Sequence, residues 1–245
     1  MIKTILFDLG ETLIYLDRPT ADVIEARVQA LHRALQEGKL EIDYRRLSDI
    51  YQAVHSELSS FSQETGIETT TSRVLEEVLA RLGIASSQPW TIDSLVQEFF
   101  EPEIKAWILY DDTIRTLSTL KNQGYCLAVV SNARSHWAVL EIMKRLKIDD
   151  FFKATVSSAG VGLRKPRPEI YLRAISHVGS NLQSTVMVGN TLDTDILGAK
   201  RLKTRALYLE REVTDRRTIE PDATVRSLSD IPGIIAEWRE SRSAP

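Results

Sequence analysis

The chain has 245 residues, of which 43% are hydrophobic and 27% are charged, and its formal net charge is −3 at pH 7. The slight acidic excess argues against a nucleic-acid partner, which usually requires a basic surface. Charged residues interrupt every apolar stretch, so we expect no membrane span and no membrane partner. Cys126 is the only cysteine, which rules out intrachain disulfides. Together with an N-terminus that lacks a signal-peptide pattern, this predicts a cytoplasmic protein.

The first predicted element is a buried strand near the N-terminus. Residues 4–7 (Thr-Ile-Leu-Phe) form a short apolar run that ends at Asp8, Leu9 and Gly10. A run this short, bounded by turn-forming residues, is typical of a strand buried on both faces of a sheet. Asp8 is therefore expected at the carboxyl end of that strand.

The block of residues 16–104 has a helical period instead. Apolar residues recur there at helical spacing in four segments. The first three segments stop at or just before Gly38, Gly66 and Gly83, and Thr91 is placed to cap the fourth. Because no segment shows a convincing strand period, we expect a small helical domain.

From about Trp107 onward, apolar strands alternate with amphipathic helices. The predicted strands are residues 126–130, 152–156, 185–188 and 205–209, with helices between them and one further strand and helix after residue 221. Strands that alternate with helices of this length imply right-handed crossovers and a parallel sheet. We therefore predict an α/β fold: a Rossmann-like parallel-sheet core of residues 1–15 and 105–245, with a helical domain of residues 16–104 inserted after the first strand.

Polar side chains follow the predicted strands at four places that are far apart in sequence. These are Asp8, Ser131-Asn132, Arg164-Lys165 and the segment from Asn190 to Asp195. The carboxyl ends of parallel strands meet at one rim of the sheet, where ligands bind in folds of this class. The four clusters are therefore expected to form a single site.

Four segments, in the same order, resemble the motifs of the haloacid dehalogenase superfamily. Residues 7–13 (Phe-Asp-Leu-Gly-Glu-Thr-Leu) resemble the first motif, normally Asp-x-Asp-Gly-Thr, and residues 130–132 resemble the second. Lys165, followed by Pro-Arg-Pro-Glu-Ile-Tyr, matches the third motif, and residues 188–199 resemble the fourth. The helical insertion is similar to the superfamily's helical cap domain. The resemblance is to the phosphatase-like hydrolases with such a cap.

This resemblance implies a role for each cluster. Asp8 is expected to be the nucleophile that forms an aspartyl-phosphate, which divides hydrolysis into two easier steps. Lys165 is expected to offset the negative charge on Asp8 and on the transferring phosphoryl group. Ser131 and the backbone of Asn132 are expected to donate hydrogen bonds to phosphoryl oxygens.

The resemblance also implies a bound Mg²⁺, because a carboxylate attacks an anionic phosphate only when a cation reduces the repulsion. Magnesium prefers hard oxygen ligands in octahedral geometry. The expected ligands are Asp8, the carbonyl of Gly10, and an oxygen of Asn190 or Asp195.

Several of these residues also have a purely structural interpretation. Aspartate is common in turns at the ends of strands, so Asp8 is alternatively a turn residue. Ser131-Asn132 is alternatively a cap for the helix that follows. Lys165 is alternatively a solvated loop charge. A carboxylate at Asp195 would also stabilise the first turn of its own helix through the helix dipole.

The chain departs from the family pattern at two positions. Gly10 stands where the phosphatases carry a second aspartate, the general acid and base, which typically contributes roughly 10²–10⁴-fold to the rate. Asn190 stands where a metal-binding aspartate is usual, so the affinity for the metal should fall. Glu11 is the candidate replacement for the missing acid and base, although successive residues of an extended backbone point to opposite sides.

The sequence therefore predicts a magnesium-dependent phosphatase that acts on a small phosphorylated metabolite, as a monomer or a homodimer. Two alternatives remain open. Because Gly10 and Asn190 replace carboxylates, the chain is alternatively a catalytically impaired protein that binds phosphate esters or regulates other proteins. The third possibility is dehalogenase-type chemistry, which needs neither the missing aspartate nor a metal.

Overall fold

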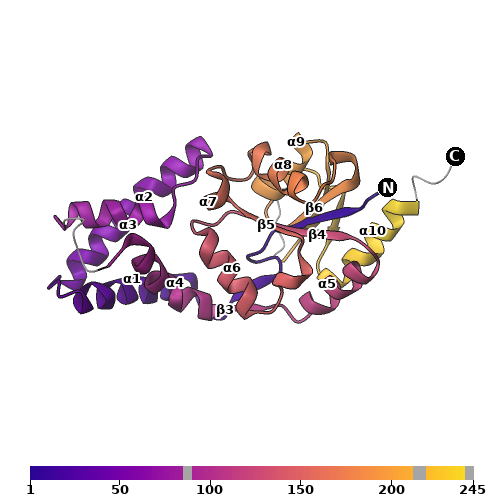
Figure 1. Cartoon of the computed structure of the whole chain (residues 1–245). Helices are drawn as coiled ribbons and strands as arrows, with labels where there is room; N and C mark the ends of the chain where they lie inside the picture. The colour runs from indigo at the N-terminus through magenta and orange to yellow at the C-terminus, as the bar shows by residue number, and fades with distance from the viewer. Residues whose placement is uncertain (85–89, 212–218, 241–245) are drawn as a thin grey trace.

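The computed structural model describes residues 1–84, 90–211 and 219–240, and its core is a six-stranded parallel sheet (Figure 1). The strand order is β5-β4-β1-β6-β7-β8. The strands are β1 (Thr4–Phe7), β4 (Cys126–Ser131), β5 (Ala154–Ser157), β6 (Thr185–Gly189), β7 (Arg205–Leu209) and β8 (Ala223–Val225). The central strands β1 and β6 are buried along their whole length, as their continuous apolar sequences predict.

Helices cover both faces of this sheet. The helices of the core are α5 (Thr113–Asn122), α6 (His136–Arg145), α7 (Ser158–Val161), α8 (Pro168–His177), α9 (Leu197–Arg201) and α10 (Ile231–Glu240). Buried residues of α5, α6 and α10 pack with one set of strand side chains, and those of α8 and α9 pack with the other set. Alternate residues of each strand face opposite sides, so both faces become hydrophobic cores. This layered arrangement confirms the predicted α/β fold class.

The described residues of the insertion after the first strand form four helices, which Figure 1 shows at one end of the sheet. They are α1 (Thr20–Glu37), α2 (Tyr44–Thr65), α3 (Thr71–Arg81) and α4 (Ile92–Ala106). Local sequence sets their ends: Gly66 closes α2 with a left-handed φ of 71°, and Thr91 and Ser94 form a capping box at the start of α4. The predicted helices and their end signals are therefore confirmed.

The four helices share a hydrophobic cluster that includes Leu47, Tyr51, Leu75 and Phe99, and Ala138 of α6 joins it from the core. We therefore propose that residues 16–104 form one domain, inserted into a core of residues 1–15 and 105–245. The chain leaves and re-enters the core through an antiparallel pair, β2 (Ile14–Leu16) and β3 (Trp107–Leu109). This pair has no counterpart among the predicted strands, because each strand is only three residues long.

Two elements differ from prediction by more than a one-residue shift of a bound. The third strand of the core lies at Ala154–Ser157 and not at residues 152–156, because Asp149–Phe151 form a 3₁₀ turn that delays its start. The helix predicted between the strands at residues 185–188 and 205–209 begins with a π-helical turn, η3 (Leu192–Ile196), before α9. Within the described residues, no helix combines the length and the apolar character needed to cross a membrane.

Candidate active site at the rim of the sheet

The register of the sheet brings the predicted polar clusters together. Phe7 of β1 pairs with Val129 of β4 and with Val188 of β6, so the residues that follow these three strands emerge side by side. A cavity of about 460 Å³ lies at this rim. Every predicted site residue lines it: Asp8, Gly10, Glu11, Ser131, Asn132, Lys165, Asn190 and Asp195. The predicted site residues therefore lie around one cavity.

The centre of the site is a buried ammonium between two carboxylates. Lys165 Nζ lies 2.5 Å from Asp8 Oδ1 and 2.7 Å from Asp195 Oδ1, and it donates a third hydrogen bond to the carbonyl of Val130 at 2.8 Å. The side chain of Lys165 is only 2% exposed, so the interpretation as a solvated loop charge is wrong. Lys165 also does not follow a strand directly, because α7 lies between β5 and this loop.

Burial and charge oppose each other in this triad. Burial lowers the pKa of Lys165, but the Asp195 and Asp8 carboxylates outweigh it and leave the pKa above its ordinary value. Burial raises the pKa of the Asp195 carboxyl to about 6, against the stabilising charge of Lys165. Lys165 therefore stays cationic between the two carboxylates.

Asp195 approaches the end of β6 because residue 189 is glycine. A Cβ added at Gly189 would lie 2.3 Å from the Asp195 carboxyl group, a distance that no side chain tolerates. The second oxygen of Asp195 accepts a hydrogen bond from the backbone N–H of Thr191 at 3.1 Å. Both carboxylate oxygens are thus already bound, and Asp195 is only 1% exposed. This geometry favours Asp195 as the anchor of Lys165 over a direct metal ligand.

Oxygen atoms suited to a hard cation meet on the other side of Asp8. The hydroxyl of Thr12 lies 3.1 Å from Asp8 Oδ2 and 3.1 Å from Asn190 Oδ1. One hydroxyl proton satisfies only one of these acceptors at a time, so the pair keeps free acceptor capacity. Together with the carbonyl of Gly10, they form a donor set of the kind magnesium prefers. Among the residues described, no cluster of three or more His, Cys, Asp or Glu side chains is arranged to hold a metal, so the proposed set relies on amide and backbone oxygens.

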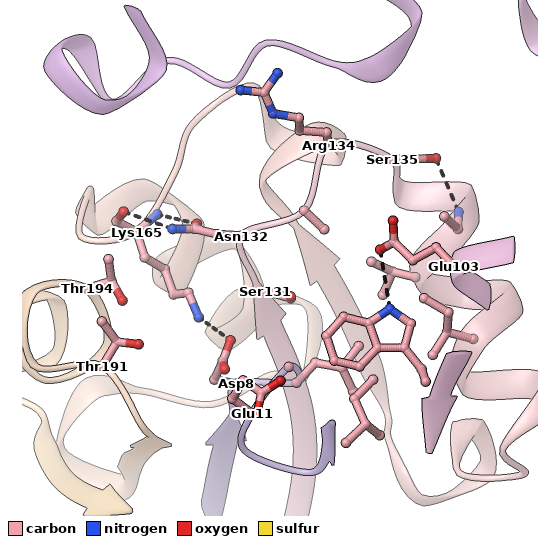
Figure 2. A pocket seen from close by; sticks show the side chains of 18 of the residues that line it. Asp8, Glu11, Glu103, Ser131, Asn132, Arg134, Ser135, Lys165, Thr191 and Thr194 are labelled. Carbon is pink, nitrogen blue, oxygen red and sulfur yellow. Dashed lines mark hydrogen bonds and ion pairs between the residues drawn. The ribbon is translucent and has the colours of Figure 1, made fainter. Parts of the chain in front are cut away.

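Ser131 and Asn132 occupy the end of β4 beside this triad. The side chain of Asn132 accepts from the N–H of Lys165 at 2.8 Å and donates to the Lys165 carbonyl at 3.1 Å, as the dashed lines in Figure 2 show. Neither residue caps the following helix, since Ser135 does so by accepting from the N–H of Ala138 at 3.2 Å. The capping alternative is therefore wrong.

Glu11 lines the cavity close to Asp8 (Figure 2). Its φ of 56° places it in the left-handed region, so the alternation expected of an extended backbone does not apply to it. Its carboxylate accepts a hydrogen bond from the hydroxyl of Tyr110 at 3.1 Å. Burial, and then the charge of Glu11, raise the pKa of Tyr110 to about 12, so this phenol remains a donor at neutral pH.

The position of the missing aspartate faces an aromatic ring. A Cβ added at Gly10 would lie 3.2 Å from Cη2 of Trp107, which is tighter than most real contacts. Trp107 in turn donates from its indole N–H to Glu103 at 3.3 Å. This contact could not be predicted from the sequence, because Trp107 lies 97 positions further along the chain.

Four residues of the insertion also line the cavity and form its insertion wall, which sequence reasoning missed: Arg27, His55, Phe100 and Glu103. Arg27 of α1 pairs with Glu103 of α4 at 2.6 Å, and His55 of α2 and Arg134 of the core lie along the same cavity. Burial, reinforced by the charges of Arg134 and Arg27, lowers the pKa of His55 to about 4. The only available sequence signal for His55 was its place beside the apolar stripe of its helix.

Comparison with known proteins places this architecture in context. The family model of haloacid dehalogenase-like hydrolases matches residues 2–203. A glyceraldehyde 3-phosphate phosphatase of Methanopyrus kandleri is 34% identical over 203 residues, which are 82% of this chain and 81% of that protein. A protein of the same name from Pyrococcus abyssi is 28% identical over 86% of this chain and 82% of its own length.

Solved structures show the same fold. A 2-haloacid dehalogenase from Pseudomonas syringae superposes with a TM-score of 0.70 at 26% identity, covering 97% of this chain and 100% of that one. A HAD phosphatase from Thermococcus onnurineus gives a TM-score of 0.58 at 23% identity, covering 96% and 98%.

Proposed function

The chain belongs to the haloacid dehalogenase-like hydrolases, and on that premise we propose that it is a magnesium-dependent phosphatase that acts on a small phosphomonoester through an aspartyl-phosphate at Asp8. Similarity to relatives named as phosphatases of a small phosphorylated metabolite supports the substrate class. The single observation that carries the proposal is the carboxylate of Asp8, which lines a cavity while Lys165 holds it at 2.5 Å. We further propose a cytoplasmic location, in keeping with the single cysteine.

In the proposed first step, an oxygen of Asp8 attacks phosphorus, and the bond from phosphorus to the ester oxygen breaks. The leaving alkoxide takes up a proton as it departs. In the second step, water attacks the phosphorus of the aspartyl-phosphate and loses a proton, which releases inorganic phosphate and restores the Asp8 carboxylate. Two displacements at one carboxylate therefore replace a direct attack by water.

Charge and hydrogen bonding around Asp8 fit these steps. Lys165 is cationic and fixed on three sides by Asp8, Asp195 and the carbonyl of Val130, so it balances charge without having to reorganise. Ser131 and the backbone of Asn132, at the end of β4, are proposed to donate to the phosphoryl oxygens. The side chain of Asn132 is committed to Lys165, which leaves its backbone N–H for this task.

Asp8, the Gly10 carbonyl and Asn190 are proposed to hold magnesium. One carboxylate oxygen of Asp195 accepts from Lys165, and the other accepts from the N–H of Thr191. When bound, the cation supplies the charge neutralisation that lets a carboxylate approach an anionic ester. With Asn190 in place of an aspartate, the site offers one full negative charge fewer than the family pattern, so binding should be weaker.

Glu11 is proposed to be the general acid and base in place of the aspartate that is missing at Gly10. It is one of two cavity-lining carboxylates outside the triad, and the other, Glu103, is held by Arg27. The hydroxyl of Tyr110 orients the Glu11 carboxylate. Glu11→Gln should lower the turnover number more than it changes KM, because proton transfer occurs in the chemical step. A loss of substrate affinity alone would assign Glu11 to binding instead.

The test is release of inorganic phosphate from p-nitrophenyl phosphate and from a panel of phosphorylated sugars and acids. The proposal expects turnover that needs added Mg²⁺, disappears with chelator, and falls about 10³-fold or more in Asp8→Asn. Binding of phosphate esters without turnover, unchanged by restoring both Gly10→Asp and Asn190→Asp, would instead identify an impaired binding protein.

Dehalogenation is the second candidate, because a specific similarity favours it. The dehalogenase from Pseudomonas syringae shares 26% identity and the whole fold with this chain, and Trp107 fills the space beside Gly10 where an aspartate would project. Halide release from 2-chloropropionate without metal decides between the two chemistries. The phosphatase proposal predicts no halide above the level of Asp8→Asn.

A further inference from the structure

Outside the cavity, a buried carboxylate joins the insertion to the core. Glu68 lies in the loop between α2 and α3, and its side chain is 0% exposed. One of its oxygens, Oε2, accepts from Arg164 Nη1 at 2.6 Å and from the hydroxyl of Ser158. A carboxylate withdrawn this far from water is stable only while such partners stay in place.

Backbone hydrogen bonds fix the same loop to the same part of the core. The N–H of Glu68 donates to the carbonyl of Gly162 at 2.9 Å, and the N–H of Arg164 donates to the carbonyl of Gly66 at 2.9 Å. Between them, Ile67 and Leu163 form an isolated antiparallel bridge. The loop of the insertion thus pairs like a short strand with the segment that leads into Lys165.

Both partners of Glu68 are connected to segments that carry the proposed phosphoryl site, Arg164 through the chain and Ser158 through a hydrogen bond. Arg164 directly precedes Lys165, whose backbone is joined to the side chain of Asn132. The hydroxyl of Ser158 accepts from the N–H of Ala133 at 2.9 Å, and Ala133 directly follows Asn132. One carboxylate of the insertion therefore holds two loops of the core in place, the loop after β4 and the loop before α8.

We propose that Glu68 is a positioning residue for hydrolysis: by engaging Arg164 and Ser158, it fixes the two loops that present Asn132 and Lys165 to the phosphoryl group. The inference rests on the proposed function of this rim. The insertion then does more than cover the cavity, because its docking completes the site. If the insertion moves away, Arg164 and Ser158 lose the carboxylate, and the Lys165 loop loses the strand-like pairing at residues 162–164.

The experiment compares Glu68→Ala, Glu68→Gln and Arg164→Ala with the wild type in two independent measurements. The first is amide hydrogen exchange by NMR at Lys165, whose N–H is bound to Asn132 Oδ1. The second is the turnover number and KM for p-nitrophenyl phosphate. We expect Lys165 exchange to be about tenfold faster in Glu68→Ala, with the turnover number about tenfold or more lower and KM changed less, because misplaced groups act in the chemical step.

Glu68→Gln keeps an acceptor oxygen for Arg164 and should recover part of the lost turnover, which also covers the case in which Glu68→Ala folds poorly. The double variant Glu68→Ala/Arg164→Ala should resemble the single variants, since the two residues act as one unit. Glu77→Ala is the matched control: it removes a carboxylate paired with Arg81 at 3.0 Å on the insertion, and it should leave both measurements unchanged.

The two proposals fail separately. Unchanged exchange at Lys165 in a folded Glu68→Ala overturns the positioning role, whatever the activity. Faster exchange with unchanged turnover overturns it as well. A wild type that releases no phosphate refutes the proposed function, and the exchange measurement then decides alone whether Glu68 fixes the loop.

Discussion

The two walls of the cavity are built on different principles. At the rim of the sheet, polar groups are bound to one another: Lys165 joins Asp8 to Asp195, and Thr12 bridges Asp8 and Asn190. The insertion wall instead presents the ring of Phe100 and His55, whose pKa lies far below its ordinary value, together with the ion pair of Arg27 and Glu103.

The difference indicates that the rim suits catalysis and the insertion wall suits selection of the substrate. A preorganised charge array on rigid strands suits a reaction in which charge moves, because little energy is spent on rearrangement during the reaction. A wall of aromatic and individually paired groups suits recognition of the rest of a substrate. Substitutions at the rim should therefore change the turnover number, while those on the insertion wall should change which ester is used.

The largest effect is expected from removal of the Lys165 ammonium group at the rim. Lys165→Met leaves Asp8 and Asp195 facing each other without a counter-charge, so turnover should fall about 10²–10³-fold. The variant should also lose about 3–5 kcal/mol of stability, the usual cost of an unpaired buried charge, as urea denaturation would show. Lys200→Met removes an ion pair with Asp222 that is about one-third exposed and should change stability by about 1 kcal/mol or less. Equal effects of the two substitutions would contradict the contrast between the rim and the surface.

The next effect tests the close approach of Trp107 to Gly10 at the rim. Gly10→Asp alone should give little gain in turnover, because its Cβ would meet Trp107 at 3.2 Å. Gly10→Asp combined with Trp107→Leu has room for the carboxylate and should gain about tenfold or more over Trp107→Leu alone, part of the usual contribution of an acid and base. A gain in the single variant equal to that in the double would show that Trp107 is no obstacle.

A smaller effect concerns the metal. Asn190→Asp adds a negative charge beside Asp8, so the concentration of Mg²⁺ at half-maximal activity should fall by about tenfold, equal to about 1.4 kcal/mol. Phosphate release measured against Mg²⁺ concentration provides the value. No shift in that concentration would remove Asn190 from the proposed ligand set.

The smallest effect tests the insertion wall through pH. The pKa of His55 is about 4 in the folded chain and 6.5 as its ordinary value, because burial and the charges of Arg134 and Arg27 disfavour protonation. Between these values the unfolded chain binds one more proton, so the free energy of unfolding falls as the pH drops from 6.5 towards 4.

After allowance for solvent screening, this loss is on the order of 1 kcal/mol. His55→Gln should lack that part of the pH dependence in urea denaturation at pH 7 and pH 4.5. His177→Gln, at an exposed position, serves as the control. A variant at position 55 with the slope of the wild type would mean that the ring is not held neutral in the folded protein.

Most of the rim could be predicted from sequence because its residues lie directly after strands or within short local motifs. Asp8, Ser131 and Asn190 follow strands whose apolar runs are visible in the sequence, and parallel topology brings such ends together. Lys165 was found through the motif, although α7 separates it from β5.

The insertion wall could not be predicted in the same way. Helical periodicity locates α1 and α2, but it does not reveal which flanking polar residue of the insertion turns toward the core. Arg27, His55 and Glu68 therefore looked like ordinary helix or loop residues, and only the packing of the insertion on the core gives them partners. Contacts between distant segments are what a single sequence conceals.

The most direct test of the central claim is a rapid-quench experiment with p-nitrophenyl phosphate and Mg²⁺, followed by borohydride trapping and peptide mapping. We predict that the trapped site is Asp8 and that Asp8→Asn gives neither the trapped peptide nor phosphate. Phosphate release by Asp8→Asn at the rate of the wild type would contradict the account.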